Sequence, residues 1–433
     1  MRQLQLLRSI VVSRLNPPYL IMAGGAVVAM GVVMAILLFA TSNRGQTAFG
    51  IPLGADFAGF YVAAQILNDG QADQLYNRAL HDELYHKLLP GEEAQAAIPY
   101  VHPPFVAGLL RPLAGLPYEI AFGIWLAMTA VLYLMAWVLL LKSIPWRDPS
   151  QNPLILLLAC SFEPFLFECW LGGQLSVLAF CSFAVCFAAL QREQPLYAGM
   201  ALGLCIYKPT ILILVLPLLV IGRRWRILLG MCITGAAFAL LSVLLVGWNV
   251  SLGYVDVLLA FSRRTSGGEL EIRVWKYVDL NNCLRLIFPH MKPVQQVLLV
   301  VIGMIPFAAL SVAWWNYERL EAEVRRLLWA TTVMWIPLLN LYFGIYDSIL
   351  ILQSLVITAA LIVRRSPVEN PLVQSGFAEF MLAIAIVPWF SQNLAATTAI
   401  PLYSLLMAVI GSYQLGWVYR STPDLWPVFR RIS

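Results

Sequence analysis

The chain has 433 residues, of which 60% are hydrophobic and 12% are charged, and its mean hydropathy is +0.77. Soluble domains carry about 25% charged residues, so this composition excludes an ordinary soluble protein. The formal net charge of +5 arises from short basic clusters between apolar runs, which is not the pattern of a nucleic-acid-binding surface. Because apolar runs of about 20 residues predict spanning helices rather than barrel strands, we expect an all-α polytopic membrane protein.

The apolar runs predict about twelve membrane spans within a single domain, residues 1–433. These spans are expected at residues 18–40, 117–141, 153–169, 174–190, 195–207, 209–222, 227–248, 293–315, 327–343, 346–363, 374–391 and 396–419. The first run follows Arg2, Arg8 and Arg14 and is too long for the core of a signal peptide, so we expect it to remain as an uncleaved span.

The distribution of basic residues predicts that both termini lie in the cytoplasm. With this orientation, most of the 28 Lys and Arg residues fall in short inward segments, as is typical of cytoplasmic loops. The two long segments 41–116 and 249–292 then lie outside the membrane. The first of them contains two amphipathic stretches, 57–68 and 77–89, which we expect to form helices.

Asp56 follows the first span and begins an amphipathic segment. The apolar residues that recur there at helical spacing are Phe57, Phe60, Tyr61, Ala64 and Leu67. A carboxylate at the membrane surface suits the deprotonation of a hydroxyl group where a lipid-borne substrate arrives. Asp56 is equally typical of a helix N-cap, and the two interpretations are compatible.

Lys208 stands between two short apolar runs in residues 195–222. These runs form two spans, a re-entrant pair or one helix kinked at Pro209. A single helix would reverse the orientation of every later segment, so two spans are favoured, with Lys208 at their outward junction. A lysine at membrane depth is usually functional, and its ammonium group can bind a phosphate; a snorkelling lysine at the interface is the alternative.

Three further acidic residues lie near expected outward ends of spans. Glu163 and Glu168 are expected to bind sugar hydroxyls, to pair with Lys208 or to form a structural ion pair, and the sequence leaves these alternatives open. Asp347 follows Tyr346 at the start of a span, where helix capping explains it and a substrate contact is the alternative.

The second outward segment contains a basic group formed by Arg263, Arg264, Arg273 and Lys276. Such groups are usually only solvated, but they also attract an anionic lipid phosphate. Trp275 and Tyr277 are expected either to stack on a sugar or to anchor the chain at the membrane interface.

Two other polar residues are weaker candidates for substrate contacts. His102 precedes two prolines that hold the backbone extended, and a lone histidine is more often structural than catalytic. Gln174 follows a Gly-Gly turn and can hydrogen-bond a sugar.

The sequence predicts neither a metal site nor another cofactor. Most of the seven cysteines lie in apolar runs, and no Cys-x-x-Cys pair is present, so they are interpreted as small core residues. No set of metal ligands at compatible spacing can be assembled, and the inward loops contain no Gly-rich phosphate-binding loop.

Five sequence blocks occur together in the order and at about the spacing of a known family. They are DFAGFYVAAQILNDGQADQLY, YVHPPFVAGLLRPLAGLP, LGGQLSVLAF, AGMALGLCIYKPTILILVLPLLVIGRRWR and YDSILIL. With these blocks the chain resembles the glycosyltransferase 87 family over roughly residues 15–420. The resemblance implies a membrane glycosyltransferase of the GT-C type, whose better-known relatives take mannose from polyprenyl-phosphate-mannose outside the cytoplasmic membrane.

The resemblance also implies residue roles. The acidic residue that follows the first span in the family matches Asp56 and implies the general base, and the Lys-Pro pair of the family matches Lys208 and Pro209. We therefore expect an inverting hexosyl transfer, with mannose as the sugar and a lipid or glycan acceptor, at the outer face of a bacterial inner membrane. The expected donor-phosphate ligands are Lys208, Arg263 and Arg264. The expected sugar or acceptor contacts are Tyr61, His102, Glu168, Gln174 and Asp347.

Two other functions remain open from the sequence. Twelve spans with inward termini are common among secondary transporters, in which Lys208, Glu163 and Glu379 would serve a substrate or proton path. No internal repeat relates the two halves of the chain, which disfavours this alternative. The third alternative is a non-catalytic lipid-binding or scaffold protein, in which Asp56 would be replaceable.

Overall fold

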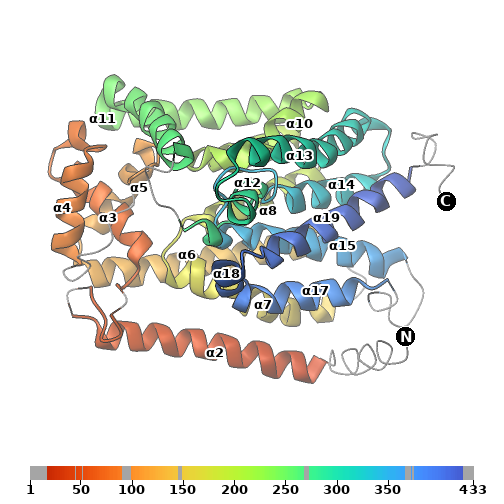
Figure 1. Ribbon diagram of the computed structural model, residues 1–433, viewed down its shortest axis with the longest axis horizontal. Coiled ribbons are helices and arrows are strands. Elements are labelled where there is room, and N and C mark those ends of the chain that lie inside the picture. The colour runs from red at the N-terminus through yellow and green to blue at the C-terminus, as the bar shows by residue number, and fades with distance from the viewer. Residues whose placement is uncertain are drawn as a thin grey trace.

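The computed structural model describes residues 17–422 apart from residues 44, 51, 90–98, 145–148, 268–272, 366–371 and 373–374. Within these ranges the chain forms helices and three isolated β-bridges but no β-strand, which confirms the all-α class. The long helices α2 (Pro17–Thr41), α13 (Lys292–Trp315) and α19 (Leu402–Arg420) run across the molecule in similar directions (Figure 1).

The first half of the chain contains α3 (Ala55–Asn68), η1 (Ala72–Gln74), α4 (Arg78–Leu88), α5 (Pro104–Ala114), α6 (Tyr118–Ser143), η2 (Pro149–Gln151), α7 (Asn152–Cys160), the π-helix η3 (Pro164–Leu171), α8 (Ser176–Gln191), α9 (Pro195–Gly203), η4 (Leu204–Tyr207), η5 (Pro209–Leu212) and α10 (Val215–Ile221). The second half contains α11 (Trp225–Gly267), η6 (Val274–Lys276), α12 (Leu280–Ile287), η7 (Tyr317–Arg319), α14 (Ala322–Trp335), η8 (Ile345–Leu350), α15 (Ile351–Arg365), α17 (Phe377–Ile386) and α18 (Pro388–Thr398).

The expected number of twelve spans is not confirmed. Five helical segments among the described residues are long and apolar enough to cross a membrane: α2, α6, Trp225–Arg263 of α11, α13 and Ile345–Arg365. Two bent pairs, α7 with η3 at 55° and α17 with α18 at 67°, raise the number to seven if each pair counts as one span. The remaining apolar helices are shorter than the roughly 20 residues that a perpendicular span requires.

Prolines and glycines account for several of these breaks. Pro388 begins α18 beside the bend that follows α17, so the expected span 374–391 is a bent pair that extends to residue 398. Gly247 interrupts α11 with φ of 80°, a conformation that favours glycine. The helices α3 and α4 cover the two stretches that were expected to be helical.

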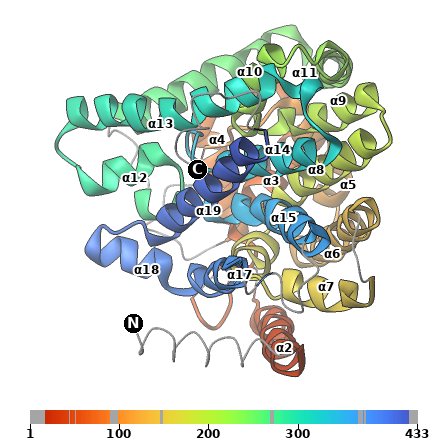
Figure 2. The same ribbon diagram turned by 90° about the vertical axis from the view of Figure 1, so that its right-hand side faces the viewer.

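Small residues allow neighbouring helices to approach closely. A Cβ atom on Gly199 of α9 would lie 1.9 Å from the carbonyl oxygen of Ile227 in α11. A Cβ atom on Gly230 of α11 would lie 2.2 Å from the carbonyl oxygen of Leu196. Such contacts stabilise helix pairs in membranes, where apolar burial against a partner helix gains little over burial in lipid. Figure 2 shows α14 and α15 near the middle of the molecule, with α2, α11 and α13 around the outside.

Three interruptions of regular α-helix position the polar residues of the interior. The chain leaves helical geometry at Lys208 between η4 and η5, tightens into the 3₁₀-helix η8 and widens into the π-helix η3. Both η3 and α8 pack against η8, which brings these segments together. Irregular backbone of this kind is tolerated at membrane depth where it is buried in protein, and π-helical turns are frequent at functional sites.

Candidate functional site

Asp56 is the second residue of α3 and lies in its first turn. The N-cap position belongs to Gly54, whose φ is 60°, and no side-chain capping bond is made there. The interpretation of Asp56 as the N-cap is therefore wrong. The helix begins at Ala55, and the left-handed Gly54 occupies the N-cap position two residues before Asp56. A carboxylate in the first turn is stabilised by the positive end of the helix dipole.

The Gly172–Gly173 turn packs directly on the start of α3. Gly173 has φ of 79°, and a Cβ atom there would lie 2.6 Å from the Cβ of Phe57. A Cβ atom on Gly172 would lie 3.6 Å from Oδ2 of Asp56. The turn leads into Gln174, whose side-chain amide donates a hydrogen bond to the Asp56 carboxylate. The sequence singled out Asp56 and Gln174 separately, and the structure places them in contact.

Burial raises the pKa of Asp56 above its ordinary value of 3.8. The hydrogen bond from Gln174 and the positive charges of Lys276 and Lys208 oppose this effect, whereas the charge of Glu168 adds to it. A carboxylate with a raised pKa is a stronger base, which suits proton abstraction nearer neutral pH.

Lys208 and Asp347 form an ion pair between the break in residues 204–212 and the start of η8. The other oxygen of Asp347 accepts a hydrogen bond from the Ser176 hydroxyl at 2.6 Å. Only 1% of the Asp347 side chain is exposed, so both of its partners are needed to compensate a buried charge. The Lys208 ammonium also lies 4.9 Å from the ring centre of Tyr346. Capping of its own helix does not explain Asp347, because its carboxylate is used by residues from distant segments.

Glu168 pairs with Lys276 and not with Lys208, the lysine that the sequence suggested. Its Oε2 atom lies 4.0 Å from Nζ of Lys276, and its Oε1 accepts a hydrogen bond from Gln392 at 2.8 Å. The turn that carries Lys276 is fixed by a β-bridge between Tyr277 and Gly344. The segment of residues 273–278 is thereby joined to the chain that leads into η8 and Asp347.

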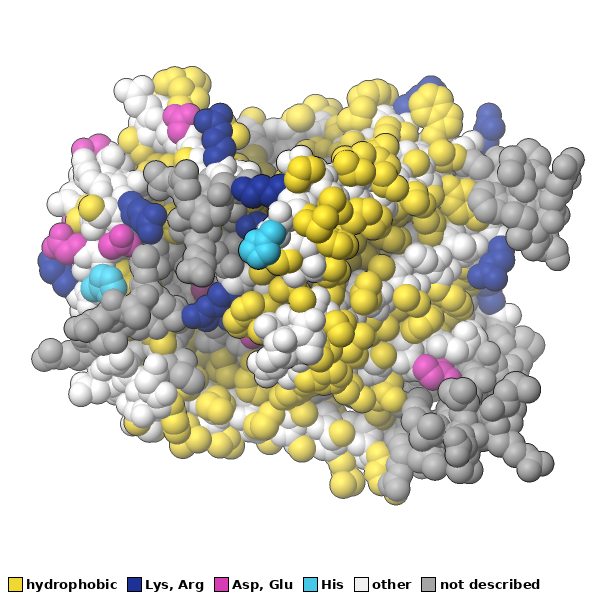
Figure 3. All heavy atoms as spheres, in the orientation of Figure 1, with side chains coloured by type: hydrophobic (Ala, Val, Ile, Leu, Met, Phe, Trp, Pro, Cys, Tyr) yellow, Lys and Arg dark blue, Asp and Glu magenta, His cyan; other side chains and the backbone are white. Residues whose placement is uncertain are grey.

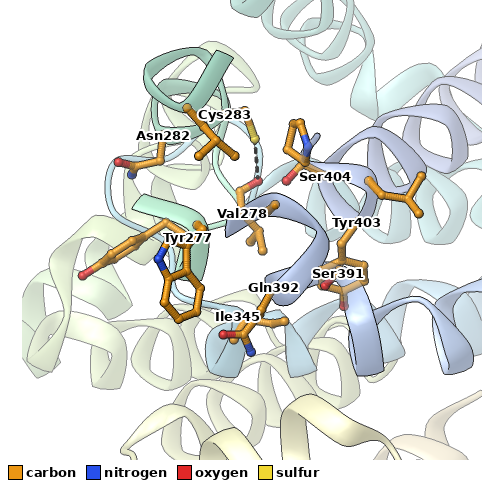
Figure 4. Close-up of a pocket in the computed structure, with 14 residues that line it drawn as sticks. Tyr277, Val278, Asn282, Cys283, Ile345, Ser391, Gln392, Tyr403 and Ser404 are labelled. Carbon is orange, nitrogen blue, oxygen red and sulfur yellow. Dashed lines mark hydrogen bonds between the residues drawn. The ribbon is translucent and has the colours of Figure 1, made fainter. Parts of the chain in front are cut away.

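A small, partly open pocket adjoins this charged group. Its lining residues are Trp275, Tyr277, Val278, Asn282, Cys283, Leu286, Ile345, Ser391, Gln392, Ala395, Pro401, Leu402, Tyr403 and Ser404. Figure 4 shows Tyr277 on one side of the pocket and Tyr403 and Ser391 on the other. Gln392 lines the pocket and also bonds Glu168, so the pocket and the charged residues are directly connected.

His102 holds the backbone next to Lys208. Its Nδ1 lies 3.0 Å from the carbonyl oxygen of Tyr207, and its ring makes an edge contact with Phe60 at 5.1 Å between centres. Burial lowers the pKa of His102 from 6.5 to about 4, while the bond to Tyr207 opposes this shift. A neutral histidine therefore donates from Nδ1 to the Tyr207 carbonyl at pH 7.

The remaining residues expected at the site make other contacts or are exposed. The hydroxyl of Tyr61 donates to the carbonyl oxygen of Leu116 at 2.7 Å, which ties α3 to the turn before α6. Arg263 is exposed near the end of α11, and the side chain of Arg264 lies outside the described residues. Glu163 is buried, and its Oε2 has no hydrogen-bond partner in the part of the chain that the structure describes.

Sequence reasoning did not assign roles to Ser176 and Gln392, and it placed Lys276 only within a general basic group. Ser176 follows Gln174 by two residues in LGGQLSVLAF, so that block held a usable signal. Gln392 lies in α18, where the sequence offers no such signal, and only the fold brings it to Glu168. Among the described residues, no three or more His, Cys, Asp or Glu side chains are grouped in a way that could hold a metal ion.

Comparison with known proteins identifies a family. The family model described as Glycosyltransferase family 87 matches residues 100–343, which is more than half of the chain and less than the range 15–420 over which a resemblance was expected. The matched range includes Glu168, Gln174, Lys208 and Lys276, whereas Asp56 precedes it and Asp347 follows it. No curated protein and no solved structure matches the chain.

Proposed function

The chain belongs to glycosyltransferase family 87, and on this premise we propose that it transfers a hexose, namely mannose, from a polyprenyl-phosphate-linked donor to a hydroxyl group of a lipid or glycan acceptor. The observation that carries the proposal is that Asp56 lies against the Gly172–Gly173 turn and close enough to Lys208 and Lys276 for both ammonium groups to lower the pKa of its carboxylate. Asp56 and the two lysines come from distant segments of the chain. Family membership lends no support to the transporter alternative.

The proposed reaction is a single displacement at the anomeric carbon. The Asp56 carboxylate takes the proton of the acceptor hydroxyl, and the acceptor oxygen forms a bond to the anomeric carbon. The bond from that carbon to the phosphate oxygen breaks at the same time, so the anomeric configuration inverts and polyprenyl phosphate leaves. Lys208, with Arg263 and Arg264 as further candidates, stabilises the charge that develops on the leaving phosphate. The raised pKa of Asp56 supports its assignment as the base.

The proposal places the reaction at the outer face of a bacterial inner membrane, with both termini in the cytoplasm. The support comes from the basic residues of the short inward segments, since cytoplasmic loops are enriched in Lys and Arg. A lipid-linked donor also suits a site whose neighbouring helices are long and apolar. Glu168 and Gln174 remain candidates for sugar or acceptor contacts. Asp347, Tyr61 and His102 would act indirectly: Asp347 by holding Lys208, Tyr61 by holding α3, and His102 by holding the backbone next to Lys208.

Transfer of labelled mannose from polyprenyl-phosphate-mannose to membrane lipids, measured with the purified chain in lipid nanodiscs, tests the proposal. Asp56→Asn removes the base while keeping the size of the side chain, and we expect turnover to fall by about 10²–10⁴-fold. Asp69→Asn is the matched control, because Asp69 is exposed at the other end of the same helix. Near-normal turnover of Asp56→Asn, or equal losses in both variants, would contradict the assignment of the base.

A further inference from the structure

We infer that Lys276 binds the phosphate group of the lipid-linked donor and exchanges Glu168 for that phosphate when the donor enters. The inference rests on the proposed function and adds to it the residue that supplies the exchangeable positive charge. It concerns binding of a phosphate carried on an apolar chain, which can be measured without sugar transfer.

Lys208 is poorly suited to be the only phosphate ligand because its charge is already compensated. Its partner Asp347 has 1% of its side chain exposed and cannot be solvated if Lys208 moves away. The hydroxyl of Ser176 alone would then compensate the buried carboxylate, and breaking a buried pair in this way is costly. Lys208 and Asp347 together carry no net charge, so they offer an approaching phosphate little long-range attraction.

Lys276 differs from Lys208 in each of these respects. Its ammonium group is 4.0 Å from Glu168, and the two side chains are 40% and 24% exposed, so this long, partly solvated ion pair contributes little stability. Glu168 keeps its hydrogen bond from Gln392 when Lys276 leaves, so its carboxylate is not stranded. Lys276 can therefore change partner at low cost.

The position of Lys276 suits a phosphate that lies near the proposed base. It stands between Trp275 and Tyr277, both of which line the pocket. The β-bridge from Tyr277 to Gly344 fixes the turn, so only the lysine side chain needs to move. Lys276 also lowers the pKa of Asp56 more strongly than Lys208 does, which shows that its charge acts at the base.

The pocket adjoins an apolar surface that suits the lipid part of such a ligand. Its apolar walls are formed by Val278, Leu286, Ile345, Ala395, Pro401 and Leu402. Figure 3, drawn in the orientation of Figure 1, shows hydrophobic side chains covering the face that α12, α13 and α18 present to the viewer. Exposed residues of this region include Ile287, Met291, Trp389 and Phe390. A prenyl chain can thus lie along this apolar surface while its phosphate contacts Lys276.

Binding of undecaprenyl phosphate to the full chain in nanodiscs, measured by the change in tryptophan fluorescence and by native mass spectrometry, tests the inference. We expect Lys276→Gln to weaken binding about tenfold or more, as loss of one charge-assisted contact to phosphate implies, and Lys276→Arg to retain most of it. The matched control is Arg273→Gln, which removes one positive charge from the same segment. Arg273 is exposed and makes no ion pair within the described ranges, so we expect less than about a threefold change from screened surface charge.

A second variant, which we expect to change binding in the opposite direction, distinguishes the exchange of Glu168 for phosphate at Lys276 from a purely structural Lys276–Glu168 pair. Glu168→Gln removes the competing charge, while its side-chain carbonyl still accepts the bond from Gln392. We expect this variant to bind undecaprenyl phosphate more tightly, by about two- to fivefold, because Lys276 no longer has to leave a carboxylate. A merely structural Lys276–Glu168 pair predicts that both variants weaken binding.

Three results would overturn the inference: no binding of undecaprenyl phosphate by the unchanged chain, equal binding by Lys276→Gln and Arg273→Gln, or weaker binding by Glu168→Gln. Failure of the proposed function is distinguishable from these results. If the unchanged chain binds the lipid phosphate through Lys276 but transfers no mannose, the assigned reaction fails and the phosphate site stands. If mannose is transferred and Lys276→Gln has no effect on donor affinity, the reaction stands and the inference fails.

Discussion

Lys208 and Asp347 form an ion pair across 139 positions of the chain, and the pair joins the break between η4 and η5 to the 3₁₀-helix η8. The Lys208 side chain is 19% exposed, whereas that of Asp347 is almost fully buried. The pair therefore stabilises two irregular segments at once, and it does so in the interior of the protein.

Removing one member of this pair should destabilise the protein strongly. We expect Lys208→Met to lower the free energy of unfolding by about 3–5 kcal/mol, because the Asp347 carboxylate is left buried without its counterion. The double variant Lys208→Met with Asp347→Leu should recover much of this loss. Thermal unfolding in detergent measures both, and a double variant that is less stable than the sum of the single changes would contradict a compensating pair.

The decrease in kcat/KM at acidic pH, here called the acid limb, should report the pKa of Asp56. Because the pKa of Asp56 is raised above 3.8 and the base must be deprotonated, kcat/KM should fall with decreasing pH before an ordinary aspartate would titrate. Gln174→Ala removes a hydrogen bond that lowers this pKa, so the limb should move to higher pH. Glu168→Gln removes a negative charge that raises it, so the limb should move to lower pH. Movement of both limbs in the same direction would argue against Asp56 as the titrating group.

His102 should make the protein less stable as pH falls below 6.5. Its pKa is 6.5 in the unfolded chain and about 4 in the folded protein, so the unfolded state binds one more proton between these values. Stability is then fully present above pH 6.5 and decreases toward pH 4, by up to about 3 kcal/mol for this single group. His102→Gln should show a flatter dependence of melting temperature on pH across this window. Parallel curves for the variant and the unchanged chain would contradict the assignment of a neutral, buried histidine.

Gly173→Ala should disturb the turn that supports Asp56. The alanine meets two obstacles, a φ of 79° and a contact of 2.6 Å with the Cβ of Phe57. Gly50→Ala is the matched control, since its φ is 69° but no atom lies within 4 Å of the added Cβ. We expect the control to cost about 1–2 kcal/mol from backbone strain alone, and Gly173→Ala to cost more and to lower turnover. Similar melting temperatures and activities for both variants would show that the close approach to α3 is unimportant.

Cysteine labelling should establish the side of the membrane on which α3 lies. Asp69 and Gln194 are exposed in turns that the basic-residue distribution places outside and inside, respectively. In a background with the exposed Cys232 replaced by serine, Asp69→Cys should react with an impermeant maleimide in intact cells. Gln194→Cys should react only after the cells are permeabilised. Reversed labelling would place the proposed reaction on the cytoplasmic side.

The sequence predicted the long helices well because their signal is local. The expected spans 18–40, 117–141 and 293–315 agree with α2, α6 and α13 to within two residues at each end. Each is a continuous apolar run that ends in polar or turn residues, so composition alone sets its limits. The expected number of spans is not confirmed where short apolar runs are broken, because hydrophobicity does not reveal whether a broken run crosses the bilayer.

The individual site residues could be found from sequence, but most of their partners could not. Asp56, Lys208, Glu168 and Gln174 stood out because charged or amide side chains are rare beside apolar runs. The pairing of Lys208 with Asp347 rather than with Glu168 depends on how η3, α8 and η8 pack, and no local spacing encodes that packing. The N-cap of α3 was misassigned because Gly54 ends the preceding turn in a left-handed conformation, which leaves Asp56 inside the helix.

The break at Lys208 also has a consequence for biogenesis. The carbonyl oxygen of Tyr207 accepts its bond from His102, and that of Thr210 accepts a bond of 2.9 Å from the amide of Asn340, which follows it by 130 positions. When residues 195–221 leave the ribosome, the first donor has already been synthesised but the second has not. The interrupted helix therefore acquires its bond from Asn340, and Lys208 acquires its ion pair with Asp347, only after these later residues have been synthesised, so the segment that carries Lys208 matures in two stages.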